Sequence, residues 1–397
     1  MRIVVFVFAL SLAAQDWPGI RGANRDGIYK GSIRTDWGEK GLKLLWKTNI
    51  GDGYGGISVA DGKVFTLEQR TKKQETAAAY SLETGKELWS NSWEGGFSSF
   101  LGGNGPRTTP TWDEGKLYVQ GAEGELRCLD ANTGKVIWQK NILNENGANS
   151  AGYGVAISPL IVKEKLITHA GGKGGKSIIA YNKSTGAKIW GALDDGPGYA
   201  SPMFVELAGT PQILMVTGKR VVGLKVEDGA LLWDHPWPTT YDINAAQPLV
   251  VGPNRVMISS GYGHGAAVIE VPKSGGTATT LIWQNKLLKN KFNSSVYLDG
   301  FVYGMDENIL SCVDAATGER KWKGGRYGYG QVLLSQGHLI VSAESGEVVL
   351  VKADPKQLIE VAKFQALEGK TWNLPALAQG KLLVRNESQM KCFDASK

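Results

Sequence analysis

A single aromatic position recurs along the chain at a nearly constant interval. It ends a segment such as Cys128-Leu-Asp-Ala-Asn-Thr-Gly-Lys-Val-Ile-Trp138, and similar segments end at the same slot elsewhere. The eight residues in this slot, separated by 39 to 52 residues, are Trp46, Trp89, Trp138, Trp190, Trp233, Trp283, Trp322 and Phe364. A period of roughly 40 to 50 residues is that of the four-stranded blades of a β-propeller.

Within one repeat unit the apolar pattern predicts four short strands. In the unit that ends at Trp138 they are 108–112, 116–120, 125–129 and 136–141. Pairs such as Asp61-Gly62 and Glu114-Gly115 supply the positive φ that a tight hairpin needs. A proline opens the first strand of five units, where a missing N–H is tolerated. The pattern therefore predicts an all-β fold that is dense in turns.

The two ends of the chain complete one unit between them. Residues 374–394 supply three strands with no Trp-bearing strand after them, whereas 42–50 supply a Trp-bearing strand with no three strands before it. Joining these ends predicts an eight-bladed β-propeller of four-stranded blades, closed by an N-terminal strand. A pair of β-sandwiches is the alternative, but it gives no reason for a Trp at a fixed interval.

The first residues have the pattern of a secretory signal. Arg2 precedes an apolar stretch and a small-x-small cleavage site, so we assign 1–13 to a signal peptide, 14–41 to an N-terminal extension and 42–397 to a single propeller. No apolar run reaches the ~18 residues of a membrane span. With no Cys at the start of the mature chain to anchor a lipid, we expect a periplasmic or secreted protein, and a monomer.

Charged, cysteine and histidine residues exclude several classes of partner. The formal net charge is +6, with 44 basic and 38 acidic residues interleaved, which is no footprint for nucleic acid. Cys128, Cys312 and Cys392 hold the same slot in different repeats, too far apart for a disulfide, so we expect buried free thiols. The four His show no ligand spacing, and we predict no metal site.

Loops that join one blade to the next lead to the axial mouth of such a ring, where a ligand site is expected. Aligning these loops selects the position three residues before each first strand, where four of eight residues are aromatic. The candidate ligand-binding residues are Tyr54, Arg107, Tyr199, Asn293, Tyr329 and Trp372. The slot just before the proline position is mostly small or polar: Thr109, Ser158, Ser201, Gln247, Ser295 and Gln331. These residues would form either a binding funnel or a packed plug, and both interpretations stay open.

Three further patterns near the mouth have competing explanations. Arg107 lies in a glycine-bearing loop and would bind a carboxylate or phosphate, or else form an ordinary loop ion pair. Asp194, Asp195, Asp242 and Asn244 offer oxygen ligands for Ca²⁺, although nothing in the sequence makes them converge. The segment 170–177 nearly matches a phosphate-binding loop, but a strand follows it where that chemistry needs a helix, so we predict a hairpin loop.

The repeat Ala/Cys-x-Asp-x-x-Thr-Gly-Lys-x-x-Trp resembles that of the pyrroloquinoline-quinone (PQQ)-like propeller repeat family. This family includes the quinoprotein alcohol dehydrogenases and the propeller lipoprotein of the outer-membrane assembly machinery. The resemblance covers about 16–393. Two further motifs, Trp17-Pro-Gly-Ile-Arg-Gly-Ala-Asn-Arg-Asp-Gly27 and Gly105-Pro-Arg-Thr-Thr-Pro110, are similar to those of exported bacterial members of unassigned activity.

The resemblance implies two classes of function. We favour an exported binding or scaffold protein, without catalysis or cofactor, whose axial mouth takes a protein partner or a small molecule. The alternative is a PQQ-dependent dehydrogenase with PQQ and Ca²⁺. Against it, the adjacent Cys-Cys pair common at that cofactor is missing, and the Glu/Asn/Asp calcium set has no residues we can assign. A hydrolase or lyase is a third class, for which no nucleophile-elbow motif appears.

Overall fold

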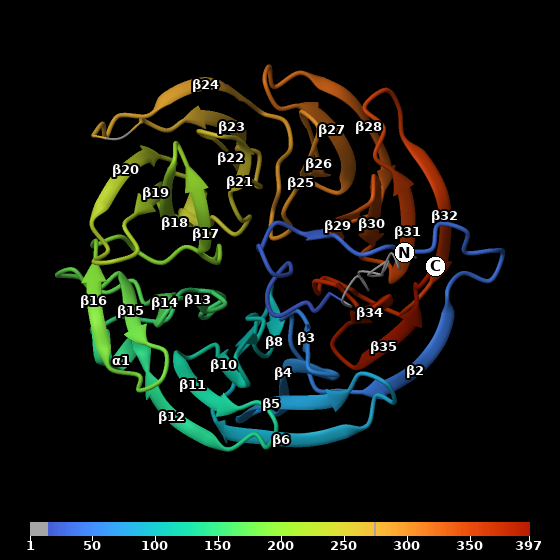
Figure 1. Cartoon of the computed structure of the whole chain (residues 1–397), viewed down its shortest axis with the longest axis horizontal. Coiled ribbons are helices and arrows are strands. Elements are labelled where there is room, and N and C mark those ends of the chain that lie inside the picture. Colours follow the sequence, from blue (N-terminus) through green and yellow to red (C-terminus); the bar gives the residue numbers. More distant parts are fainter. Residues whose placement is uncertain (1–14, 274) are drawn as a thin grey trace, which may run out of the picture.

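Each repeat unit folds into one antiparallel blade whose strands run in chain order from the axis outward (Figure 1). The computed structural model describes residues 15–273 and 275–397, so the expected signal peptide lies outside the described residues. Eight such blades form a closed ring, which confirms the predicted eight-bladed propeller.

Seven blades take their four strands from one continuous stretch of chain. The first three contain β3 (Ser58–Ala60), β4 (Lys63–Thr71), β5 (Gln74–Ser81) and β6 (Glu87–Glu94); β9 (Thr111–Asp113), β10 (Lys116–Gln120), β11 (Glu125–Asp130) and β12 (Val136–Asn141); and β13 (Leu160–Val162), β14 (Lys165–His169), β15 (Ile178–Asn182) and β16 (Lys188–Ala192). The next two contain β17 (Met203–Leu207), β18 (Thr210–Val216), β19 (Arg220–Leu224) and β20 (Leu231–Pro236); and β21 (Leu249–Gly252), β22 (Arg255–Ser260), β23 (Gly265–Glu270) and β24 (Thr280–Asn285). The last two contain β25 (Val296–Leu298), β26 (Phe301–Asp306), β27 (Ile309–Asp314) and β28 (Arg320–Arg326); and β29 (Gln331–Ser335), β30 (His338–Ser342), β31 (Glu347–Lys352) and β32 (Ile359–Gln365).

The eighth blade joins the two ends of the chain. It contains β33 (Ala376–Ala378), β34 (Lys381–Arg385), β35 (Gln389–Asp394) and, as its outer strand, β2 (Lys43–Asn49). Strand β2 pairs antiparallel with β35, and Trp46 lies opposite Cys392. The closure inferred from the two incomplete units is therefore confirmed.

A few elements lie outside the blades. A small hairpin, β7 (Ser98–Ser99) and β8 (Gly103–Asn104), interrupts the loop between the first two blades. The helix α1 (Ile142–Asn146) and the 3₁₀ turn η1 (Thr240–Asp242) are short connections, and no helix of the described ranges is long and apolar enough to cross a membrane.

A bulge directly precedes the slot tryptophan in seven blades, whereas in the blade of Phe364 it precedes Ala362, two residues before the predicted slot. The register between the third and fourth strands shifts just beside the pairs Cys128 with Trp138, Ala180 with Trp190 and Cys312 with Trp322. A bulge bends the outer strand locally. We infer that this bend leans each indole onto the next blade.

The slot tryptophans tie each blade to its neighbour. Trp46 Nε1 donates to Leu82 O at 2.8 Å and Trp138 Nε1 donates to Lys183 O at 3.0 Å, each in the following blade. The indole face covers the glycine of the following Thr-Gly turn: a Cβ on Gly85 would lie 2.5 Å from Trp46, and one on Gly186 would lie 2.9 Å from Trp138. Only glycine fits there, because its φ is also about +70°.

Three slots depart from this pattern. Trp322 Nε1 donates to Asp354 O of the next blade at 2.8 Å, but that turn has no glycine for the indole to cover. Trp233 donates to Gln212 of its own blade, at 2.6 Å. Phe364 has no N–H, but its ring occupies the space beside Gly41, where a Cβ would meet Phe364 Cβ at 2.3 Å. Gly41, just before β2, thus takes the position that a turn glycine has in other blades.

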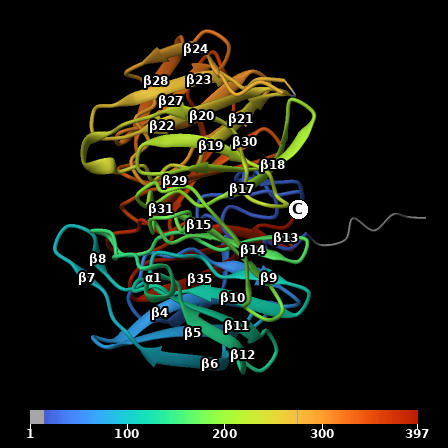
Figure 2. The same ribbon diagram turned by 90° about the vertical axis from the view of Figure 1, so that its left-hand side faces the viewer.

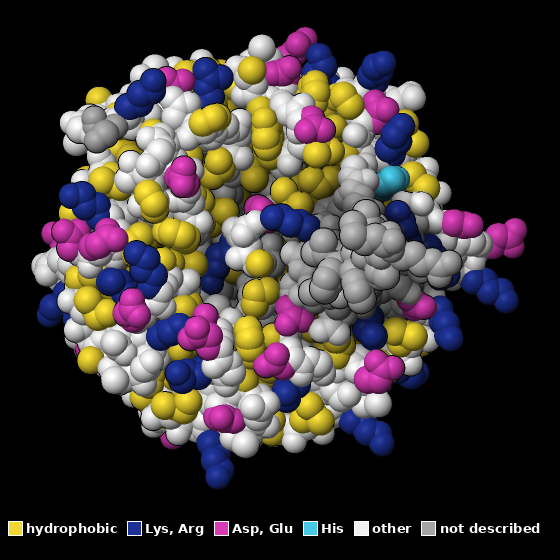
Figure 3. All heavy atoms as spheres, viewed as in Figure 1, with side chains coloured by type: hydrophobic (Ala, Val, Ile, Leu, Met, Phe, Trp, Pro, Cys, Tyr) yellow, Lys and Arg dark blue, Asp and Glu magenta, His cyan; other side chains and the backbone are white. Residues whose placement is uncertain are grey.

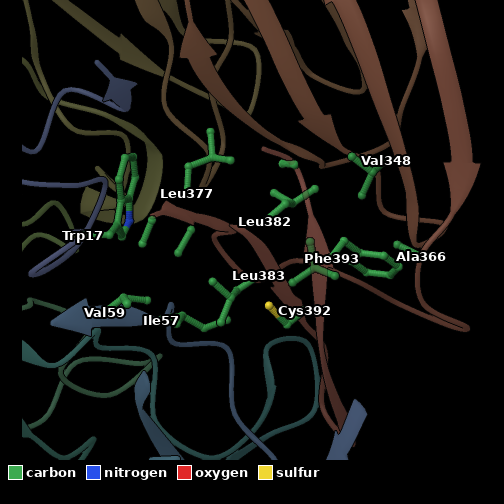
Figure 4. Close-up of a cluster of buried hydrophobic side chains, with 14 of the residues drawn as sticks. Trp17, Ile57, Val59, Val348, Ala366, Leu377, Leu382, Leu383, Cys392 and Phe393 are labelled. Carbon is green, nitrogen blue, oxygen red and sulfur yellow. The ribbon is translucent and has the colours of Figure 1, made fainter. Parts of the chain in front are cut away.

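The eighth blade, which joins the two ends of the chain, packs around a large cluster of buried apolar side chains. Figure 4 shows residues from both ends of the chain, among them Ile57, Val59, Leu383 and Phe393, meeting in one core with Trp17. All of these side chains are buried. Burial of apolar area, at roughly 25 cal/mol per Å², is the main force that holds the ends together.

The N-terminal extension enters the ring. Strand β1 (Ile28–Tyr29) adds parallel to β29 as a fifth strand, and Trp17 bridges to Val59 of β3. Between these two anchors, Arg21 and Arg25 are buried and donate to backbone carbonyls of several blades. The segment therefore runs through the centre of the ring (Figure 1).

Both minor predictions about cysteine and the glycine-rich loop are confirmed. Cys128, Cys312 and Cys392 are buried and free, and burial raises the pKa of the Cys312 thiol to about 12. Residues 170–177 form the hairpin loop between β14 and β15, followed by a strand.

Mutating a slot tryptophan should destabilise the ring. Trp138→Ala removes an indole that packs on the next blade, and we expect a loss of about 3 to 5 kcal/mol in the free energy of unfolding. Trp372→Ala, in an interblade loop at the mouth, should cost much less. Urea denaturation of both variants measures the difference, and equal losses would contradict the division between ring contacts and mouth.

Removing the closing strand should expose a strand edge. Deletion of Lys43 to Ile50 leaves β35 without its partner, and an unpaired edge favours association between chains. We expect a lower melting temperature, and we expect aggregation that light scattering can measure. A truncated protein that stays monomeric and keeps the full-length melting temperature would disprove this role for β2.

Acid should weaken the fold through His169. Burial lowers the pKa of His169 to about 4, while an unfolded His titrates near 6.5. Between these values only the unfolded chain binds the proton, so this contribution is complete above pH 6.5 and is lost as the pH falls toward 4. The loss is about 3 kcal/mol.

The test compares unfolding free energies of wild type and His169→Gln between pH 7 and pH 4. Glutamine can keep the bond that His169 Nε2 makes to Ser177 Oγ at 3.0 Å, so the variant should remain folded. We expect a shallower pH dependence in the variant. An equal slope in both proteins would rule out His169 as the titrating group.

Candidate ligand-binding cavity

The eight interblade loops converge on a cavity of about 340 Å³ at one axial end of the ring. Each loop contributes at least one lining residue. Leu101 and Gly102, from the β7–β8 hairpin, also line it, and Figure 2 shows this hairpin on the side opposite the C-terminus. The volume falls within the roughly 300–1,000 Å³ of ligand pockets.

The walls of the cavity are aromatic. Phe292 lies between Trp372 and Tyr329, with ring centroids 4.8 and 5.5 Å apart, and Trp372 continues to Tyr54 at 5.5 Å. Tyr153 and Tyr199 form a second pair at 5.7 Å. The complete aromatic lining is Tyr54, Tyr153, Tyr199, Tyr262, Phe292, Tyr329 and Trp372.

The charge of the lining is entirely positive. Arg21, Arg107 and Lys291 line the cavity, and among the described residues no Asp or Glu lines it. Lys291 Nζ lies 4.3 Å from the ring centroid of Tyr329 and 4.7 Å from that of Tyr262, and no carboxylate pairs with it in the described part of the chain. Its ammonium group is therefore available to an anion.

Arg21 forms the inner end of the cavity. Its guanidinium donates to Ser295 O at 2.7 Å and Asp26 O at 3.1 Å, with longer contacts of 3.3 and 3.4 Å to two further carbonyls. Burial lowers its pKa to about 10, a shift that Asp26 offsets only in part. The side chain therefore remains charged at neutral pH.

Arg25 continues this positive interior. It contacts Pro202 O at 2.9 Å and Ser158 O at 3.1 Å, and burial lowers its pKa to about 9. A buried charge without a counter-charge is costly even when its donors are satisfied. The extension thus brings uncompensated positive charge to the axis.

Most hydrogen-bond donors of the Arg107 guanidinium bind carbonyl oxygens of its own loop. Nη2 donates to Gly103 O at 2.9 Å and Gly102 O at 3.0 Å, and Nη1 donates to Gly105 O. The group also stacks on Phe97, 4.4 Å from the ring centroid, and burial lowers its pKa to about 10. It shapes the loop and adds positive charge, with few donors left for a bidentate contact.

The structure brings together five of the six residues selected from the sequence. Tyr54, Arg107, Tyr199, Tyr329 and Trp372 all line the cavity. Asn293 does not: it is buried behind the wall, and its Nδ2 donates to Gly330 O at 3.0 Å. The neighbouring Phe292 and Lys291 take the lining positions in that loop.

Several lining residues were missed from the sequence. Tyr153 lies in an aligned loop but outside the aligned position, and Tyr262 lies in the β22–β23 hairpin, which the alignment of interblade loops did not cover. Arg21 belongs to the N-terminal extension. The Trp17–Gly27 motif contains Arg21 and marked this segment as notable. However, the motif does not predict that the N-terminal extension enters the ring.

The small polar slot before each first strand has a structural role. Gly56 N donates to Thr109 Oγ1, Thr109 N to Ser158 Oγ and Ser158 N to Ser201 Oγ, at 2.8 to 3.0 Å. Each bond joins one blade to the next around the axis. Ser201, Gln247 and Gln331 from this slot also line the cavity.

The acidic residues near the mouth do not converge. Asp195 pairs with Arg220 at 2.7 Å, and Asn244 is buried with its Nδ2 donating to Thr217 O and Gly218 O. Asp194 accepts a bond from Gly175 N. Across 15–273 and 275–397, no group of three His, Cys, Asp or Glu side chains is placed to hold a metal ion.

The ring of eight blades and its repeated sequence define the protein as an eight-bladed propeller of PQQ-like repeats. Residues 73–324 match the family described as outer membrane protein assembly factor BamB, and the chain belongs to this family. The BamB of Yersinia pestis is 20% identical over 285 residues, 68% of each chain. The quinohemoprotein alcohol dehydrogenase of Comamonas testosteroni is 25% identical over 203 residues, 47% of this chain but only 26% of the dehydrogenase.

Solved structures with the same fold include both BamB proteins and quinohemoprotein alcohol dehydrogenases. The crystal structure of BamB from Moraxella catarrhalis has a TM-score of 0.64 at 17% identity, over 89% of this chain and 99% of that one. The quinohemoprotein alcohol dehydrogenase ADHIIG from Pseudomonas putida HK5 also has a TM-score of 0.64, at 12% identity, over 96% and 80%. At these identities the likeness establishes the fold alone.

The lining fits one part of the dehydrogenase cofactor and not the other. The positive charge of the lining suits the carboxylates of PQQ. A hard cation such as Ca²⁺ takes carboxylate oxygens, and the lining has none. The residues present therefore do not fit PQQ together with its metal.

Proposed function

We propose that this protein is a non-catalytic binding protein whose axial cavity holds a small anionic ligand with apolar faces. One observation carries the proposal: the lining contains three cationic side chains, seven aromatic ones and no carboxylate. Elsewhere in this ring Asp195 neutralises Arg220. Here a ligand would supply the negative charge.

The enclosed position strengthens this attraction. The N-terminal extension closes the inner end of the cavity, so a bound anion lies among low-dielectric walls, where charges interact more strongly than in water. Lys291 already lies against two tyrosine rings, which orient its ammonium group without neutralising it. The site is therefore preorganised for negative charge.

Binding is favoured over dehydrogenation by the same lining. A quinoprotein reaction needs a cation beside the cofactor, and the cavity offers no carboxylate to hold one. The family named for an outer-membrane assembly factor supports a binding or scaffold role, with a protein partner as the other kind of ligand. We place the protein in the periplasm or outside the cell, and expect a monomer of one propeller domain that follows a signal peptide and an extension.

We expect no nucleic-acid partner. On the face shown in Figure 3, basic and acidic side chains alternate around the rim, without a continuous basic stripe. Phosphate backbones require such a stripe. The concentrated positive charge lies inside the ring.

Reversing one cavity charge tests the proposal. The probes are PQQ, citrate and digalacturonate, each with wild type, Lys291→Glu and the matched control Lys225→Glu, an exposed lysine in the turn between β19 and β20. We expect at least one anion to raise the wild-type melting temperature, and Lys291→Glu to weaken its binding at least tenfold, about 1.4 kcal/mol.

The control variant should bind like the wild type. Binding should also weaken as salt rises from 20 to 300 mM, because screening reduces the attraction. If no anion shifts the wild-type melt, or if both charge reversals have the same effect, the cavity is not an anion site.

A further inference from the structure

We infer that the anion is an acidic saccharide: a hydroxylated sugar ring that carries a carboxylate or a sulfate. The inference rests on the proposed function and narrows it to one chemical class. Three features of the cavity carry it: two unpartnered acceptors, the tilt of the aromatic rings and a single free ammonium group.

Two buried glutamines of the lining have an oxygen without a partner. Gln331 Nε2 donates to Trp372 O at 2.9 Å and Gln247 Nε2 to Ser201 O at 3.4 Å, which fixes the orientation of each amide. Their Oε1 atoms accept no bond from the part of the chain that the structure describes, although the two side chains are only 1% and 7% exposed. A buried acceptor left unpaired costs roughly 1 to 3 kcal/mol.

Such acceptors call for donors on the ligand. A flat polycarboxylate offers many acceptors and hardly any O–H or N–H groups, so it would leave both glutamine oxygens unpaired. A sugar carries several hydroxyl donors. The lining therefore favours a small ligand that carries both anionic and hydroxyl groups.

The aromatic walls suit a puckered ring. Neighbouring rings in the wall are tilted by 41° between Tyr54 and Trp372, 52° between Phe292 and Trp372 and 51° between Phe292 and Tyr329. They form a curved surface and not a flat slot. The C–H faces of a sugar can lie on such a surface, whereas a planar tricyclic molecule stacks best on a flat one.

The free ammonium of Lys291 completes the site. It lies against Tyr329, one of the rings of this curved wall. An acidic group on a sugar seated against the wall would meet this cation, while the glutamines receive hydroxyls. The arrangement would discriminate against neutral sugars, which leave Lys291 unpaired.

The experiment measures the affinity of the wild-type protein for four probes by calorimetry. They are digalacturonate, a sulfated disaccharide of similar size, lactose as the neutral counterpart, and PQQ as the flat polycarboxylate. We expect an acidic disaccharide to bind at least tenfold more tightly than lactose and than PQQ. The two acidic arms show whether carboxylate or sulfate is the preferred group.

Two variants separate the contacts. Lys291→Gln should reduce affinity for the acidic disaccharide and leave that for lactose unchanged. Gln331→Met keeps the side-chain length but removes the acceptor, and should weaken both disaccharides about tenfold while PQQ is unaffected. A matched Lys225→Gln variant should behave as wild type.

The outcomes distinguish this inference from the proposed function. If PQQ binds and depends on Lys291 while the saccharides do not bind, the cavity is an anion site but the saccharide inference is wrong. If lactose binds as well as the acidic disaccharides, the inference is also wrong. If none of the four probes binds and citrate does not bind either, both the saccharide inference and the proposed function are overturned.

Discussion

The contact between the slot indole of one blade and the Thr-Gly turn of the next is the interaction on which this ring depends. The indole N–H donates to a carbonyl of the next blade, and its face covers a glycine that has no room for a Cβ. Five indoles, Trp46, Trp89, Trp138, Trp190 and Trp283, make this glycine contact with the next blade, and we infer that it sets the spacing and the lean of those blades. The serine and threonine hydroxyls near the axis add a second belt of interblade bonds. A single closed ring follows, and with it a central channel.

The N-terminal extension crosses that channel, and its Ile20 and Arg21 line the inner end of the cavity. It is held at two places, by Trp17 beside Val59 and by β1 beside β29, so that Arg21 and Arg25 are placed at the axis. Neither arginine pairs with a carboxylate in the described residues, and both remain charged at neutral pH despite burial. Packing elsewhere in the ring must offset the free energy of holding these charges there. Such a locally unfavourable arrangement is typical of functional sites.

The ring could be predicted from the sequence because the physical signals were local and repeated. A Trp every 39 to 52 residues, with a positive-φ turn before it, indicates one blade, and counting incomplete units at the two ends gave the closure. The site was predictable only where loops share one shape. Tyr54, Tyr199, Tyr329 and Trp372 reached the cavity from the aligned position. In the loop before β25 the aligned Asn293 is buried and bonded to Gly330 O, and its neighbour Phe292 lines the cavity. Arg21 could not be placed, because its position depends on the extension crossing the whole ring.

The central claim is that positive charge, enclosed by the extension and unpaired within the protein, makes the axial cavity an anion site. A crystal soaked in bromide tests this directly, because bromide is a small anion whose position anomalous diffraction reveals. We predict a bromide peak within the cavity beside Lys291, and its loss in crystals of Lys291→Glu. Bromide bound only on the outer surface, with the cavity free of anion density, would contradict the account.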